Sequence, residues 1–99
     1  MEISKILDGG RLSLALAGRL DTVTAPQLQM ELDASLGGVT ELAFDFAALE
    51  YISSAGLRVM LSAHKKMASA GGTMSIAGAN AMVREVFDMT GFSDILTLL

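Results

Sequence analysis

The sequence predicts an α/β protein in which helices pack on one face of a mixed β-sheet. Apolar residues alternate with small or polar ones near the amino terminus, as in a strand, and recur every three or four positions in later segments, as in a helix. Paired glycines separate several of these segments. Two strand-like runs come first and helix-like runs then alternate with strand-like ones, so the predicted order is strand-strand-helix-strand-helix-strand-helix-strand. A chain of 99 residues suits one compact unit, and we expect a single domain over residues 1–99.

The first two strands are expected at residues 3–7 and 11–18, joined by a turn that contains a glycine pair. In the second run, Leu12, Leu14 and Leu16 alternate with serine and alanine. Because successive side chains of a strand point to opposite faces, this pattern predicts one buried leucine face. The two runs are therefore interpreted as a β-hairpin.

The first helix is expected in "APQLQMELDASL", residues 25–36. Thr24 or Ala25 stands at the cap position, and Pro26 falls in the first turn, where its missing N–H costs little. Leucines at every fourth position predict the buried side of this helix, and a glycine pair ends it. The next apolar run, "TELAFDF" at residues 40–46, is typical of a buried central strand.

A second amphipathic helix is expected from Ser54 to Ala70, because its apolar and polar residues fall on different sides of the helical wheel. The run "TMSIAG" at residues 73–78 predicts another strand. Asn80 then caps a third helix, "AMVREVFDMT", which Gly91 stops, and "DILTLL" is expected as a last extended segment. Right-handed crossovers would place two of these helices on one face of the sheet.

Composition and charge exclude several classes of function. The formal net charge is −4 and no run of lysine or arginine occurs, so neither nucleic-acid binding nor attachment to an anionic membrane is expected. The chain has no cysteine, which excludes disulfides and cysteine-ligated zinc. Acidic residues lack ligand spacing and no phosphate-binding glycine loop occurs, so we expect no metal and no cofactor. We find no signal peptide and no apolar stretch near the ~20 residues that span a bilayer, which favours a cytoplasmic location.

Two adjacent serines in "YISSAGLRVML", residues 51–61, form the main candidate site. A nucleophilic serine needs a base within hydrogen-bond reach. The only histidine, His64, lies ten residues beyond Ser54 on the same predicted helix, roughly 15 Å along its axis. The G-x-S-x-G nucleophile elbow is also absent, so we expect no hydrolase activity and no enzyme.

Helix capping accounts for one of the two hydroxyl groups. Ser53 follows a strand-like run, and its hydroxyl would accept a hydrogen bond from the first turn of the helix, worth ~1 kcal/mol. Gly56 inside that turn costs ~1 kcal/mol relative to alanine, and a small residue there permits a close approach by another group. A phosphate on Ser54 would lie where free N–H groups and the helix dipole favour anions. Capping and a phosphorylation switch therefore both remain open from the residues alone.

The same stretch carries a resemblance to a known family. "FDFAALEYISSAGLRVML" resembles the signature of the STAS domain in bacterial anti-sigma factor antagonists. "LAGRLDTVTAPQL" is similar to the family segment that leads into the first long helix, and "AGANAMVREVFDMTGFSDIL" to its closing helix and strand. These segments together cover nearly the whole chain, and the resemblance implies a STAS-like fold.

The resemblance also implies a function and a set of partners. Family members bind an anti-sigma factor that is also a GHKL-type serine kinase, and this binding releases a sigma factor. The kinase phosphorylates a serine at the start of the second helix, which breaks the complex, and a PP2C-type phosphatase restores the free form. The phosphoacceptor matches Ser54. The implied partner-binding residues are Asp21, Ser53, Ser54, Gly56, Leu57 and Arg58.

The sequence departs from the family pattern in two places. The best-known members have aspartate before the acceptor, whereas this chain has Ser53, which makes Ser53 an alternative acceptor. Many members continue into a further helix after the last strand, whereas the sequence ends at Leu99. We therefore expect a less covered sheet, which favours self-association.

A second function remains open beside this one. The same kind of domain serves as an interaction module in lipid-transport ABC complexes, signalling scaffolds and anion-transporter tails. In that case Ser54 would be a cap or an interface residue and would never carry a phosphate.

Overall fold

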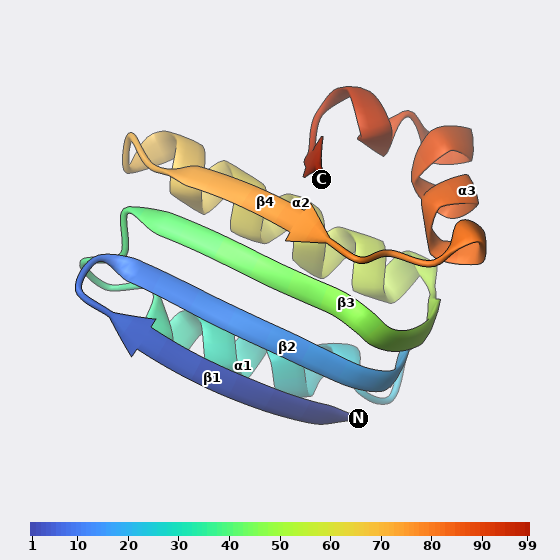
Figure 1. Ribbon diagram of the computed structural model, residues 1–99, viewed down its shortest axis with the longest axis horizontal. Coiled ribbons are helices and arrows are strands. Elements are labelled where there is room, and N and C mark those ends of the chain that lie inside the picture. The colour runs from blue at the N-terminus through green and yellow to red at the C-terminus, as the bar shows by residue number, and fades with distance from the viewer.

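The computed structural model describes residues 1–99 and shows a mixed five-stranded sheet with helices α1 and α2 side by side on one face (Figure 1). The strand order is β1-β2-β3-β4-β5, with β1 antiparallel to β2 and every other neighbouring pair parallel. The strands are β1 (Glu2–Asp8), β2 (Arg11–Leu20), β3 (Glu41–Ile52), β4 (Thr73–Ala77) and β5 (Thr97–Leu98). The helices are α1 (Ala25–Ser35), α2 (Ser54–Ser69), α3 (Ala81–Thr90) and the short 3-10 helix η1 (Phe92–Asp94). The predicted fold class and element order are confirmed.

The hairpin of β1 and β2 forms as predicted. Gly9 adopts a φ of +60° in the connecting turn, a conformation that residues with a Cβ rarely adopt. The predicted leucine face of β2 is confirmed, because Leu12, Leu14 and Leu16 are at most 1% exposed. β1 lies at the edge of the sheet and is exposed at all but one of its positions.

Strand β3 is longer than predicted. It runs for 12 residues to Ile52, although the sequence pattern placed its end at Phe46. Its pairing with β2 shifts after Asp45, whose Oδ1 accepts a hydrogen bond of 2.9 Å from the N–H of Ala47. Beyond this bulge β3 continues beside β2, because the pairing extends to Leu20 opposite Ile52. The extension carries the chain directly to the two serines.

The last predicted strand is wrong over most of its length. Of the predicted segment, residues 94–99, only Thr97 and Leu98 pair with β4, whereas η1 ends at Asp94 and the two residues that follow it form a turn and a bend. Leu96 is 4% exposed and packs into the core, while Ile95 is 46% exposed. The Leu96 side chain therefore fills its place in the core although the segment does not form a full strand.

Helix α3 has the predicted boundaries. The side-chain oxygen of Asn80 accepts a hydrogen bond of 2.8 Å from the N–H of Val83, and Gly91 ends the helix in the left-handed conformation with a φ of 79°. Phe87 is fully buried and stacks on Phe46 of β3, with ring centroids 6.4 Å apart. This contact fixes α3 against the end of the sheet.

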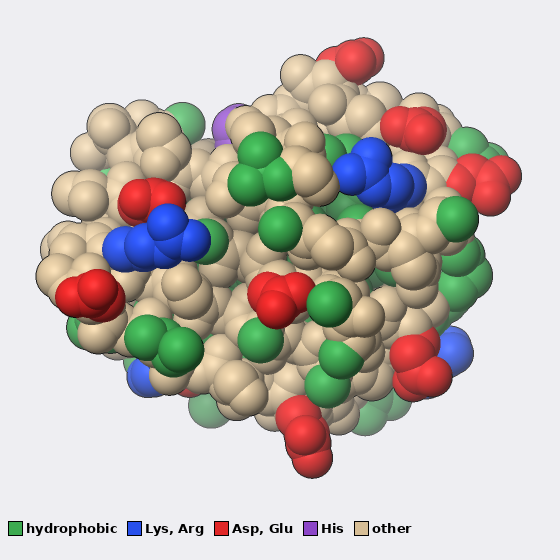
Figure 2. Space-filling model, viewed as in Figure 1, with side chains coloured by type: hydrophobic (Ala, Val, Ile, Leu, Met, Phe, Trp, Pro, Cys, Tyr) green, Lys and Arg blue, Asp and Glu red, His purple; other side chains and the backbone are tan.

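The other face of the sheet carries no helix (Figure 1), and Figure 2 shows charged groups scattered over it. Its central side chains are small and only half-buried: Ser13, Ala15, Ala17, Ala43 and Ser75. The core, a single cluster of 23 buried residues, lies on the helix side. The molecule therefore has two layers, a sheet and a layer of helices. The loops that follow β2 and β3 lie side by side at the carboxyl ends of these two strands.

Candidate functional site

The predicted site lies where α2 begins, at the carboxyl ends of β2 and β3. Ser53 has an extended backbone, with φ −100° and ψ 175°, and connects Ile52 of β3 to α2. Its N–H donates a hydrogen bond of 2.9 Å to the carbonyl of Leu20 at the end of β2. Its side-chain oxygen accepts a hydrogen bond of 3.4 Å from the N–H of Gly56. Ser53 is thus the N-cap that the sequence predicts, tied to both strands.

Ser54 is the first residue of α2 and its side chain is exposed. Its hydroxyl makes no side-chain hydrogen bond, in contrast to that of Ser53, which caps the helix. The first turn of α2 contains no acidic residue, so the positive end of the helix dipole is not neutralised there. Ser54 is therefore exposed to solvent at the positive end of the helix dipole.

Gly56 and Leu57, two of the predicted partner-binding residues, are buried. A Cβ at Gly56 would lie 2.7 Å from Leu20 Cγ, 2.9 Å from Ile52 Cγ1 and 3.0 Å from the Leu20 carbonyl oxygen. The close approach expected at this glycine is thus made by the protein's own β2 and β3. In the free chain both residues set the position of α2 beneath Ser54, and their contact with a partner stays a prediction.

Asp21 lies in the loop between β2 and α1 and is half-buried. Its Oδ1 accepts hydrogen bonds from the N–H groups of Val23 and Thr24, at 3.0 and 3.1 Å, and lies 3.2 Å from the Thr24 hydroxyl oxygen. The hydrogen bond from the Thr24 backbone is the main cause that lowers the pKa of Asp21 below its ordinary value. The carboxylate thus shapes the loop before α1, and a partner would meet it already hydrogen-bonded.

The Thr24 side chain does not cap α1. Its hydroxyl donates instead to the carbonyl of Arg19, at 2.8 Å. The Arg19 guanidinium in turn lies 4.2 Å from the centroid of the Tyr51 ring and 3.8 Å from the Asp21 carboxylate. Sequence reasoning missed Arg19 and Tyr51, because they are brought together only by the pairing of β2 with β3.

Arg58 is exposed, as a partner-binding residue requires, and lines a shallow groove between α1 and α2. The groove has a volume of about 380 Å³, and its other lining residues are uncharged: Thr22, Ala25, Pro26, Gln29, Ala55 and Val59. Val23 in the preceding loop is 85% exposed. The sequence did not predict that residues of α1 line this groove, because they are ordinary residues for the start of a helix.

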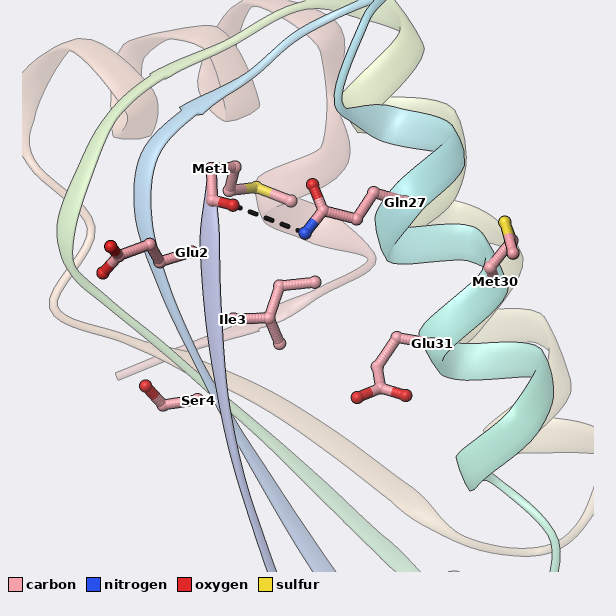
Figure 3. Close-up of a pocket in the computed structure, with 7 residues that line it drawn as sticks. All are labelled: Met1, Glu2, Ile3, Ser4, Gln27, Met30 and Glu31. Carbon is pink, nitrogen blue, oxygen red and sulfur yellow. Dashed lines mark hydrogen bonds between the residues drawn. The ribbon is translucent and has the colours of Figure 1, made fainter.

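The largest cavity, about 630 Å³, lies elsewhere, between β1 and α1 (Figure 3). Ile3 points from β1 toward α1, and the Gln27 side chain donates a hydrogen bond of 3.4 Å to the carbonyl of Met1. Glu2 and Ser4 point to the other side of the strand (Figure 3). The cavity is open and contains none of the predicted site residues.

The only histidine of the sequence lies away from Ser54. His64 lies ten residues beyond Ser54 on α2 and lines a separate pocket with Gly72 and Thr73 near the amino end of β4. No group of three histidine, aspartate or glutamate side chains is placed to hold a metal ion. None of the helices is both long enough and apolar enough to span a membrane.

Comparisons with known proteins show the family of the chain. A family model for the STAS domain matches residues 3–99. BtrV from Bordetella bronchiseptica, provisionally named an anti-sigma factor antagonist, is 38% identical over 87 residues, which are 87% of this chain and 75% of BtrV. The anti-sigma F factor antagonist of Paenibacillus polymyxa is 28% identical over 91 residues, which cover 90% of this chain and 78% of that protein.

Solved structures show the same fold at lower identity. The unphosphorylated form of the anti-sigma factor antagonist SpoIIAA superposes with a TM-score of 0.80 and 18% identity, covering 99% of this chain and 87% of SpoIIAA. A structure from Thermotoga maritima gives a TM-score of 0.91 at 18% identity, covering 97% of this chain and 84% of that one. From the match of the family model over nearly all its residues and from its relatives, we conclude that this chain belongs to the STAS domain family.

Proposed function

We propose that the protein is an anti-sigma factor antagonist that is switched off by phosphorylation of Ser54. The observation that carries this proposal is the position of Ser54, exposed at the first residue of α2 and matching the phosphoacceptor position of the family. The relatives named as anti-sigma factor antagonists support the same role. The proposed partners are an anti-sigma factor that is also a GHKL-type serine kinase, and a PP2C-type phosphatase.

Phosphorylation would change the charge of the surface without disturbing the fold. The kinase would transfer the γ-phosphoryl group of ATP to the Ser54 oxygen; the bond to the β-phosphate breaks, ADP leaves and the hydroxyl proton is lost. The modified side chain would carry about −1.5 to −2 charges at neutral pH. The exposed position of Ser54 lets the phosphate remain in solvent, and like-charge repulsion would then displace acidic groups of the partner.

Ser54 is a better acceptor than Ser53. The Ser53 side chain is half-buried and caps α2 through Gly56, whereas Ser54 is exposed and has no such bond. Phosphorylation of Ser53 would require the cap to be broken. Incubation with the cognate kinase and ATP, followed by mapping of the site by mass spectrometry, should place the phosphate on Ser54 in the wild type and in Ser53→Ala.

Binding measurements test the switch itself. Ser54→Ala should bind the anti-sigma factor like the wild type, because the exposed hydroxyl makes no bond that the fold needs. Ser54→Asp should bind at least tenfold more weakly, as expected if one added charge costs about 1.4 kcal/mol at the interface. Equal binding by both variants, or an unmodified protein after treatment with a kinase that is active on another substrate, would contradict the proposal. Such a result would favour the alternative function, in which the domain is an interaction module of another assembly and Ser54 never carries a phosphate.

A further inference from the structure

Arg58 is a cationic residue of the candidate site that has no ion-pair partner. The four ion pairs of the structure use Lys5, Arg11, Arg19 and Lys66. Arg58 is exposed and takes part in none of them, and its guanidinium makes no hydrogen bond within the chain. The positive charge of Arg58 is therefore available to bind an anion.

Ser54 and Arg58 lie one helical turn apart on α2, and both are exposed. Side chains four residues apart on a helix have Cβ atoms about 5–6 Å from each other, which is within reach of a phosphate and a guanidinium. An anion on the amino-terminal side of the cation is the favourable orientation, since each charge then complements the helix dipole.

The groove around Arg58 offers no competing anion, and the two acidic residues of α1, Glu31 and Asp33, pair with Lys5 and Lys66. The residues of α1 that line the groove with it are uncharged, as are the flanking residues of α2. The carboxylate of Asp21, in the loop before α1, is already bonded to Thr24 and close to Arg19. A phosphate on Ser54 would be the first anion placed within one turn of Arg58 on this helix.

We propose that Arg58 holds the phosphate of phosphorylated Ser54 as an intrahelical ion pair. This inference rests on the proposed phosphorylation of Ser54 and concerns what the phosphate does once it is present. The pair withdraws the only charged side chain from the groove between α1 and α2. Phosphorylation then has two effects on the same surface. It adds the negative charge of the phosphate, and it engages the positive charge of Arg58.

Phosphorus NMR of the phosphorylated protein tests the pair directly. Phosphoserine is incorporated at position 54 during translation, so that no kinase is needed, and the second pKa of the phosphate is measured in 0.1 M salt. In the wild type this pKa should lie about half a unit below that of Arg58→Gln, as expected for a unit charge roughly 5 Å away in a water-like medium. Arg58→Lys keeps the charge without the planar fork, and should retain part of the shift.

Lys65→Gln is the matched control, because Lys65 is exposed on the same helix and the substitution removes the same charge. Lys65 lies about 16 Å from Ser54 along the helix axis, beyond the Debye length of about 10 Å at 0.1 M salt. The control should therefore leave the phosphate pKa unchanged. Equal pKa values in the wild type and Arg58→Gln would overturn the inference.

Salt provides a second measurement that needs no substitution. Raising the salt to 1 M, where the Debye length is about 3 Å, should bring the wild-type pKa toward that of a phosphoserine tripeptide in the same buffer. A difference from the tripeptide that does not respond to salt would also overturn the pair. Because the phosphate is built in, these results are independent of the proposed switch: failure of a kinase to modify Ser54 would contradict the proposed function alone.

Discussion

Replacement of Gly56 by alanine should destabilise the protein, although alanine is the better helix former. The added Cβ would lie 2.7 Å from Leu20 Cγ and 3.0 Å from the Leu20 carbonyl oxygen. Leu20 is fully buried, and its carbonyl also accepts the hydrogen bond from Ser53 that anchors the start of α2. Neither group has room to move away, so the helix itself must shift.

The expected loss follows from two opposing effects. Overpacking of this kind costs about 1–3 kcal/mol, whereas the gain in helix propensity is at most about 1 kcal/mol. A contact of 2.7 Å puts the overpacking in the upper part of its range. The net effect should therefore be a loss of about 1–2 kcal/mol, which lowers the melting temperature of a domain of this size by roughly 5–15 °C. The lower part of this range applies if α2 yields by a few tenths of an ångström.

Thermal and urea unfolding followed by circular dichroism measures this loss. Gly37→Ala is the matched control, because a Cβ there meets nothing within 4 Å and the backbone has no positive φ. The control should stay within about 0.5 kcal/mol of the wild type. A Gly56→Ala variant as stable as the wild type would refute the view that this glycine exists for close packing of α2 on β2.

Three further changes test other parts of the structure. Asn80→Ala should lower the free energy of unfolding by about 1–2 kcal/mol, and Ser53→Ala should lower it less. The reason is that the Asn80 cap bond is 2.8 Å long, whereas the Ser53 cap bond is 3.4 Å long. A larger loss for Ser53→Ala in urea unfolding would contradict this. The pKa of Asp21 is lowered mainly by the Thr24 N–H, so the stability from this carboxylate is present above its unfolded value and is lost as the pH falls below about 4. Urea midpoints at pH 7 and pH 3 should therefore differ less in Asp21→Asn than in the wild type, and an equal difference would count against the bond. Phe87→Ala should cost about 3–5 kcal/mol, because Phe87 is fully buried, whereas Met89→Ala, at a side chain 79% exposed, should be neutral.

Local patterns predicted the starts of α2 and α3 well because each has its own capping residue. Asn80 and Gly91 bracket α3, and Ser53 caps α2, as the sequence indicated. Such caps act over one turn and need no distant contact. The alternating leucines of β2 predicted the buried face for the same reason, since the period of two is a property of the strand alone.

The strand ends were predicted less well, because a strand ends where its partner does. β3 continues through Ala47 and Ala48, which are weak strand formers, since β2 pairs with it across a bulge. The run before Leu99 does not form a continuous strand, because Leu96 reaches the core without extended pairing. Neither outcome follows from the segment itself.

The sequence by itself determined the order of the elements and the buried face of β2, because periodicity and caps are encoded within a few residues of one another. The acceptor role of Ser54 is implied by the family resemblance and stays a prediction. Only the tertiary structure decided what surrounds that acceptor. It buried Gly56 against β2 and β3, placed Leu57 in the core, and left Arg58 uncovered beside α1. These placements depend on how separate elements pack, which requires contacts between residues distant in the chain.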